Sequence, residues 1–246
     1  MTYCLAAKVN KGLVFASDSR TNAGVDYVTT YSKMHIFTWP EDRIYVLLCS
    51  GNLATSQAVV NIINEDLENP KAKFNLCKAK HLYEVAHYLG KVSQHEQQLH
   101  SEGIKSSKTN IEASFIFGGQ IAGSNPDIYM IYPQGNYISA STETPFLQIG
   151  ENKYGKPILD RIINHNTTLE DAARCALVSL DSTIRSNISV GPPLELAIYE
   201  ADTLVEPRHL KLTMQSTLYK SLRKHWNEGL RREFDRLPRF DWETKK

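Results

Sequence analysis

The sequence predicts an α+β fold of four layers, in which two antiparallel sheets stack face to face and helices cover their outer faces. Three observations predict this α-β-β-α sandwich. Strand patterns gather in two blocks, helical patterns follow each block, and one further strand pattern comes late in the chain. A parallel doubly wound fold would need regular alternation of strands and helices, which the sequence lacks.

The first strand block opens the chain. Two short apolar runs, 2–9 and 13–18, flank a turn that ends at Gly12 and together predict a hairpin. After a polar loop, residues 34–37 and 44–49 predict two more strands. Chain ends are normally frayed, so a strand at the very start indicates a terminus that is held in the fold.

Two helices and a second strand block follow. Residues 51–67 and 79–99 place their apolar side chains at helical spacing. After a polar linker, strand character returns over 113–119, 128–132 and around 137–139. This order predicts that the second block of strands stacks against the first.

A third helical stretch and a late strand complete the core pattern. The helix is predicted to begin at Thr168, where Thr168 and Asp171 have the spacing of a capping box, and to end near Ser186. Pro192-Pro193 cannot continue a helix, and the alternation over 194–199 predicts a strand.

The last part of the chain has a different character. Apolar residues recur at intervals of four among many charged ones, which predicts an amphipathic helix with a narrow apolar stripe: Leu218, Leu222, Trp226, Leu230 and Phe234. The stripe fits a helix folded back on its own core, and it equally fits a contact with another subunit. We therefore expect one domain over 1–246, with a C-terminal helical extension over about 217–246.

Composition narrows the function. The chain has 28 Lys and Arg against 27 Asp and Glu, so no basic excess indicates nucleic-acid binding. It has neither a leader pattern nor the ~20 consecutive apolar residues that span a bilayer, so we expect no membrane partner and a cytoplasmic protein. The four widely spaced cysteines form no disulfide framework or zinc motif: Cys4, Cys49, Cys77 and Cys175.

Thr2 is the first candidate for chemistry. A threonine with a free α-amino group combines nucleophile and base, because the amine has a reference pKa of about 7.7–8.0 and lies beside the hydroxyl. Removal of Met1, which a small second residue favours, would free that amine. Many proteins begin with Met-Thr, so the pair alone does not indicate a catalytic threonine, and the motifs elsewhere in the chain have to support that role.

Those motifs form a recognisable combination. It comprises Ala16-Ser17-Asp18-Ser19-Arg20 after the second strand, Gly24 in the next loop, Lys33-Met34 at the third strand, Ser50-Gly51 before a helix, and the segment 186–193. The combination resembles the β-subunits of the proteasome and, within that superfamily, is similar to the bacterial ancestral β-subunit group, Anbu. The resemblance covers about residues 2–200 and implies the four-layer fold of the N-terminal nucleophile hydrolases.

The resemblance also implies roles for individual residues. Thr2 would be the nucleophile, Lys33 the charged neighbour of its hydroxyl, and Asp18 the partner that fixes Lys33. This arrangement is physically coherent, since a buried lysine is costly unless a carboxylate pairs with it. Gly51 would supply the backbone N–H that binds the oxyanion, a task that favours glycine because the substrate must approach the main chain closely.

Support for the threonine amine is where the sequence departs from the family. Asp181 and Ser186 are the candidates, but they are further apart than the corresponding residues of proteasomes. The family's Gly-Ser-Gly element has no clear counterpart unless Ile149-Gly150-Glu151 occupies its place.

The resemblance implies a threonine hydrolase that cleaves amide bonds, in peptides, through an acyl ester on Thr2. It implies no metal and no organic cofactor, and it implies assembly into a homo-oligomer; an unfoldase partner, if used, is not identifiable. Two alternatives stay open: an amidase of the same chemistry acting on a small or γ-glutamyl-type amide, and a catalytically silent scaffold subunit.

Overall fold

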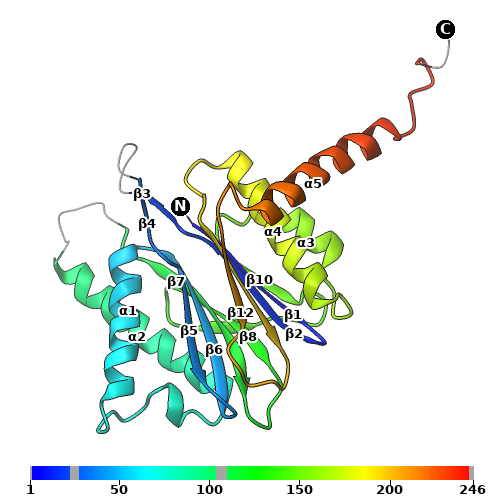
Figure 1. Ribbon diagram of the computed structural model, residues 1–246. Helices are drawn as coiled ribbons and strands as arrows, with labels where there is room; N and C mark the ends of the chain where they lie inside the picture. Colours follow the sequence, from blue (N-terminus) through cyan, green and yellow to red (C-terminus); the bar gives the residue numbers. More distant parts are fainter. Residues whose placement is uncertain (1, 23–27, 104–109, 244–246) are drawn as a thin grey trace.

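The computed structural model describes residues 2–22, 28–103 and 110–243. Met1, Gly24 and the last three residues of the expected tail, 244–246, lie outside these ranges. Within the described ranges, the strands form two five-stranded antiparallel sheets and one two-stranded ribbon (Figure 1).

The first sheet has the order β10-β1-β2-β11-β12. Its strands are β1 (Tyr3–Val9), β2 (Gly12–Asp18), β10 (Phe146–Gly150), β11 (Leu194–Glu200) and β12 (Arg208–Leu212). The second sheet follows chain order: β5 (Met34–Trp39), β6 (Arg43–Gly51), β7 (Ala113–Ile121), β8 (Asp127–Ile131) and β9 (Tyr137–Ser139). The ribbon pairs β3 (Arg20–Asn22) with β4 (Val28–Thr30).

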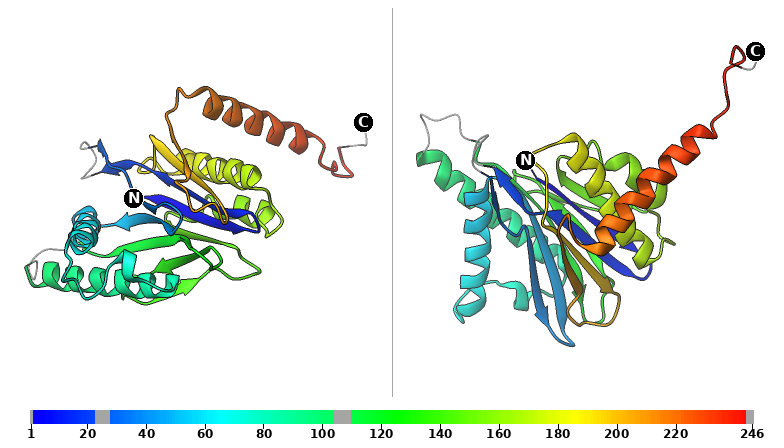
Figure 2. Two further views of the ribbon diagram at one scale, coloured as in Figure 1. Left: turned by 60° about the horizontal axis from the view of Figure 1, so that its bottom comes forward. Right: turned by 45° about the horizontal axis from the view of Figure 1, so that its top comes forward.

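Helices cover the outer face of each sheet, which confirms the predicted α-β-β-α sandwich (Figure 2). α1 (Leu53–Glu68), α2 (Leu82–Gly103) and the short 3-10 helix Leu76–Lys78 cover the second sheet. α3 (Lys156–Ile162) and α4 (Leu169–Ser186) cover the first sheet. α5 (Thr217–Asp235) starts against α4 and then projects from the body (Figure 1).

Burial on both faces explains why the first strands are almost continuously apolar. Alternate β1 residues face opposite sides of a sheet: Leu5 and Ala7 pack with α3 and α4, whereas Cys4 and Ala6 pack against the second sheet. A pattern of alternating polar residues would appear only if one face met water. β1 is therefore held from both sides immediately after Thr2.

Several elements have no counterpart in the predictions from sequence. β10 is the most important, because it pairs with β1 and places Gly150 opposite Tyr3. The ribbon, α3 and β12 were also not predicted. The limits of the third helical stretch were predicted correctly, since α4 follows an N-cap at Thr168 and ends at Ser186.

α5 is anchored at its first turns only. Tyr219 is fully buried and donates its hydroxyl to Asp181 of α4 over 3.2 Å, and Arg223 makes an ion pair with the same carboxylate. Further along, the apolar stripe lies at the surface, with Leu230 52% and Phe234 72% exposed. The stripe is therefore only partly used by the chain's own core.

The N-cap of α4 should make a small contribution to the stability of the protein. Thr168 Oγ1 accepts a hydrogen bond from the Asp171 N–H over 3.1 Å, so Thr168→Ala should lower the free energy of unfolding by about 1 kcal/mol. Chemical denaturation would measure the loss. Ser182→Ala, near the other end of the same helix, should cost nothing because alanine favours helix; equal losses in both variants would contradict a capping role.

Candidate functional site

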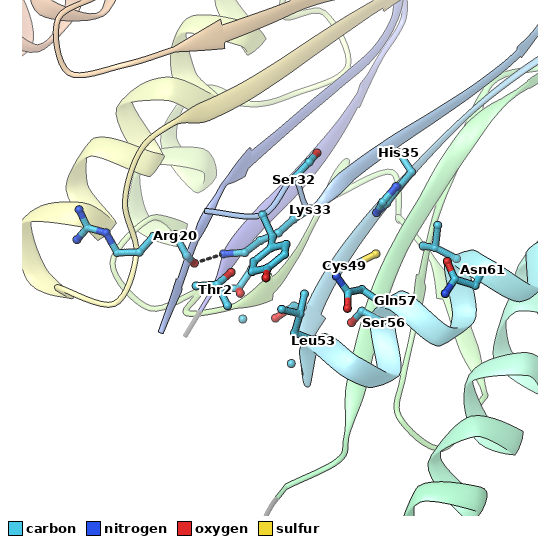
Figure 3. A pocket seen from close by; sticks show the side chains of 16 residues that line it. Thr2, Arg20, Ser32, Lys33, His35, Cys49, Leu53, Ser56, Gln57 and Asn61 are labelled. Carbon is cyan, nitrogen blue, oxygen red and sulfur yellow. Dashed lines mark hydrogen bonds between the residues drawn. The ribbon is translucent and has the colours of Figure 1, made fainter. Parts of the chain in front are cut away.

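A pocket of about 570 Å³ opens where the two sheets meet the start of α1 (Figure 3). Thr2 and Lys33 line it from the positions directly before β1 and β5, Gly150 from the end of β10, and residues 49–51 from the end of β6. α1 supplies the opposite wall. Three of the residues singled out from sequence, Thr2, Lys33 and Gly51, thus share one cavity.

Thr2 is fixed by its neighbours on both strands that flank β1. Its carbonyl oxygen accepts a hydrogen bond from the Glu151 N–H over 2.7 Å, and the next N–H, of Tyr3, donates to Asp18 Oδ1 over 3.0 Å. Thr2 is only 8% exposed. The threonine is therefore a rigid part of the pocket wall.

Lys33 and Asp18 form a buried ion pair beside Thr2. The Lys33 Nζ lies 2.7 Å from Asp18 Oδ1 and donates a second hydrogen bond, also 2.7 Å, to the Arg20 carbonyl. The Asp18 side chain is fully buried, and its Oδ2 accepts the Gly191 N–H over 3.1 Å. This geometry agrees with the partnership implied by the resemblance.

Burial also acts on the acid of this pair. It raises the pKa of Asp18 above its ordinary value, and the Lys33 ammonium and the two backbone N–H donors oppose that rise. The carboxylate has no contact with water, and its hydrogen bonds to these donors fix its position. Asp18 therefore fixes where the Lys33 charge lies relative to Thr2.

Gly51 ends β6 with a backbone that favours glycine. Its φ is +101°, and a Cβ there would lie 2.3 Å from the Glu112 carbonyl oxygen. Alternate N–H groups of a strand point to opposite neighbours. Since the Cys49 N–H donates to the Lys33 carbonyl and the Asn52 N–H to Glu112, the Gly51 N–H points to the side of Lys33.

The structure does not bring Asp181 and Ser186 into this pocket. The Asp181 carboxylate is bound by Arg185 at 3.1 Å, by Arg223 and by the Tyr219 hydroxyl, so it joins α4 to α5. Ser186 is exposed at the end of α4. Neither side chain lines the cavity around Thr2.

A polar residue that sequence reasoning did not assign lies next to Thr2 instead, and a second one holds its side chain. Glu151 donates its N–H to Thr2, is 8% exposed, and accepts a hydrogen bond from Asn187 Nδ2 over 3.0 Å. The signal was present in the segment Ile149-Gly150-Glu151. It could not be used, because β10 was not predicted and its pairing with β1 was unknown.

One part of the pocket wall carries polar side chains that are uncharged at neutral pH. His35, Gln57, Asn61 and Ser32 line it, and the Ser32 hydroxyl donates to the buried carboxylate of Glu195 over 2.6 Å. Burial lowers the pKa of His35 below its ordinary value of 6.5, and the charge of Glu195 opposes that change. At neutral pH these side chains can therefore form hydrogen bonds with a bound molecule without contributing a charge.

The burial of His35 predicts how the free energy of unfolding changes at mildly acidic pH. Because its pKa is lower in the folded than in the unfolded protein, its contribution is fully present above the unfolded value of about 6.5 and is lost as the pH falls from there through the lower pKa of the folded protein. His35→Gln should flatten the fall in unfolding free energy between neutral and mildly acidic pH, measured by denaturation. His87→Gln, on the exposed face of α2, should leave the slope unchanged; an identical slope in both variants would refute the prediction.

Within 2–22, 28–103 and 110–243, no group of three or more His, Cys, Asp or Glu side chains could hold a metal ion. In the same residues, no helix has both the length and the apolar character needed to cross a membrane.

Comparisons with known proteins agree with the geometry. The model of the proteasome subunit family matches residues 2–199. Among solved structures, the chain is similar to Anbu, the ancestral β-subunit, from Yersinia bercovieri, with 42% identity, a TM-score of 0.92, and coverage of 98% of this chain and 100% of that one. A search of the curated proteins found no match.

Two further structures are similar over the same length. The helical assembly of the Anbu complex from Pseudomonas aeruginosa shares 43% identity, with a TM-score of 0.93 and coverage of 99% of this chain and 100% of that chain. Anbu from Hyphomicrobium sp. strain MC1 shares 42% identity, with a TM-score of 0.88 and coverage of 98% and 100%.

Proposed function

The chain belongs to the proteasome subunit family, and from this premise we propose that it is a threonine-type hydrolase of amide bonds, with Thr2 as nucleophile once Met1 is removed. The observation that carries the proposal is the buried Lys33–Asp18 pair, which holds a positive charge at the wall that Thr2 shares. A scaffold has no need of a desolvated ion pair at that place, because such pairs add little to stability.

The chemistry follows from the positions of these groups. Thr2 Oγ1 attacks the carbonyl carbon of the amide, and its proton passes to the α-amine, which then delivers it to the leaving nitrogen. Lys33 stabilises Thr2 Oγ1 as negative charge develops on it, and the Gly51 N–H donates a hydrogen bond to the oxyanion that forms from the substrate carbonyl. Water then hydrolyses the acyl ester, with the α-amine as base.

The substrate is a peptide that binds at the pocket lined by Thr2. The pocket wall is mixed: Gln57 and Asn61 can form hydrogen bonds with a substrate side chain, and Leu53 and Val60 offer apolar contact. An amidase acting on a small or γ-glutamyl-type amide uses the same chemistry. Comparing hydrolysis of denatured protein with that of short amides separates the two.

We further propose that the protein assembles with copies of itself. One relative is described as forming a helical assembly, and in this chain the outer part of α5 and the segment after it expose an apolar set that its own core leaves uncovered: Leu230 and Phe234 in α5, then Leu237, Phe240 and Trp242. Sedimentation of the full chain would show the oligomer, and Phe234→Glu should weaken it. A monomer at all concentrations would contradict the proposal.

The activity is tested by covalent labelling. The protein is incubated with a peptide epoxyketone, which reacts with both the hydroxyl and the amine of a terminal threonine, and is then examined by intact mass and peptide mapping. We expect one adduct on Thr2 of the chain that lacks Met1, and none in Thr2→Ala. A processed terminus that takes no adduct would favour the silent scaffold.

A further inference from the structure

Glu151 lies directly opposite Thr2 across the β1–β10 pair. Tyr3 pairs with Gly150, and the Glu151 N–H donates to the Thr2 carbonyl over 2.7 Å, which extends the register by one residue. β10 ends at Gly150, whose φ is +83°, so Glu151 lies just beyond the paired strand. The backbone of Glu151 is therefore in direct contact with Thr2, and its side chain starts from that point.

The nitrogen of Thr2 also faces β10. In an antiparallel pair, the N–H and C=O of one extended residue point to the same neighbouring strand, and the next residue points to the other. The carbonyl of Thr2 faces Glu151, whereas the N–H of Tyr3 faces Asp18 on β2. A free amine on Thr2 would thus lie on the side of Glu151, and Lys33 would lie on the side of Asp18.

The Glu151 carboxylate lacks a cation among the residues that the structure describes. It is 8% exposed, its hydrogen-bond donor is the neutral amide of Asn187, and it takes part in no ion pair within those residues. A carboxylate buried without a positive partner is costly. The cation that would neutralise the Glu151 carboxylate is therefore not one of the described side chains.

Asn187 holds that carboxylate in one orientation. As the C-cap of α4, it donates its own backbone N–H to the Thr183 carbonyl. Its side-chain Oδ1 accepts the Ser189 N–H over 2.9 Å, which leaves Nδ2 to donate to Glu151. The end of α4 thereby fixes an acid beside Thr2, a task for which sequence reasoning had proposed Asp181.

We propose that Glu151 is a positioning residue that binds the α-ammonium of Thr2 after Met1 has been removed. The inference rests on the proposed processing of Thr2, but it does not require that the protein hydrolyse anything. Three other charged groups border this place. Lys33 and Asp18 neutralise each other, and the guanidinium of Arg20 donates to the Ile188 carbonyl over 2.7 Å. In Figure 3 the Arg20 guanidinium points away from Thr2.

The ion pair has a consequence for proton transfer. A carboxylate within contact distance favours the charged form of the amine, so it raises the pKa of that amine by about one unit or more. The amine then accepts the Thr2 proton less readily at neutral pH. Labelling of Thr2 should therefore rise with pH through the alkaline range.

The test measures the amine directly. Traces of acetic anhydride are added to the full-length protein over a range of pH, and acetylation of the Thr2 amine is quantified by peptide mass spectrometry. We expect the midpoint to fall by about one pH unit in Glu151→Gln. Glu151→Asp, which keeps the charge, should retain most of the wild-type midpoint, and Glu170→Gln, exposed on α4, should retain all of it.

Three results would overturn the proposal. They are retention of Met1 in the purified protein, an unchanged midpoint in folded Glu151→Gln, and an equal shift in Glu151→Asp and Glu151→Gln. Circular dichroism confirms that each variant is folded before it is titrated. A shifted midpoint without any epoxyketone adduct would support the role of Glu151 and refute the hydrolase, so the two proposals fail separately.

Discussion

Lys33→Ala is expected to slow epoxyketone labelling of Thr2 by about 10²–10³-fold at neutral pH. The reason is electrostatic: the Lys33 Nζ is held at 2.7 Å from Asp18 in a site that excludes water, where a fixed charge stabilises a developing alkoxide far more than it does in water. The measurement is the rate of adduct formation by intact mass, normalised to the folded fraction.

The matched control is Lys8→Ala. Lys8 also pairs with an aspartate, since its Nζ lies 2.8 Å from Asp127 Oδ1, but the side chain is 31% exposed and lies further along β1. Loss of such a partly exposed pair should cost at most about 1 kcal/mol of stability and leave labelling unchanged. Equal rates in Lys33→Ala and Lys8→Ala would remove Lys33 from the mechanism.

Gly150→Ala should both destabilise the protein and abolish labelling. The backbone of Gly150 has a φ of +83°, and a Cβ there would lie 2.0 Å from the Thr2 carbonyl oxygen. Strain of this kind costs about 1–3 kcal/mol, and the displacement that relieves the clash must move Thr2 or β10. We expect a loss of about 2–4 kcal/mol in the free energy of unfolding, measured by chemical denaturation.

Gly123→Ala separates the two causes. Gly123 has a similar φ of +75°, but a Cβ there would meet nothing within 4 Å. That variant should show only the cost of the left-handed backbone, about 1 kcal/mol, and normal labelling. If Gly150→Ala behaves in the same way, the close approach of β10 to Thr2 is not what holds the site.

The parts of the fold that could be predicted from sequence are those with strong periodicity. β1 and β2 are buried on both faces, and α4 carries an N-cap at Thr168 and a broad apolar face, so their patterns are unambiguous. β10 has five residues and lies at a sheet edge, and its pattern is too short to stand out. Its place depends on contacts with β1, far away in sequence.

The same distinction applies to the candidate site. Asp18 and Lys33 belong to a compact motif, and the structure brings them together. Asp181 was a candidate only because the family has an acid in that part of the chain, and its carboxylate is instead bound by Tyr219 and Arg223 of α5. Glu151 could be linked to Thr2 only through strand pairing, which no local pattern records.

The burial of Thr2 in a pocket wall determines how this protein must be produced. An affinity tag or reporter joined ahead of Thr2 would emerge inside a cavity of about 570 Å³ and would block the amine. α5 leads the chain away from the sheets (Figure 1), so a fusion placed after it emerges far from the cavity. A preparation in which a protease scar precedes Thr2 would report on a capped molecule, whatever its purity.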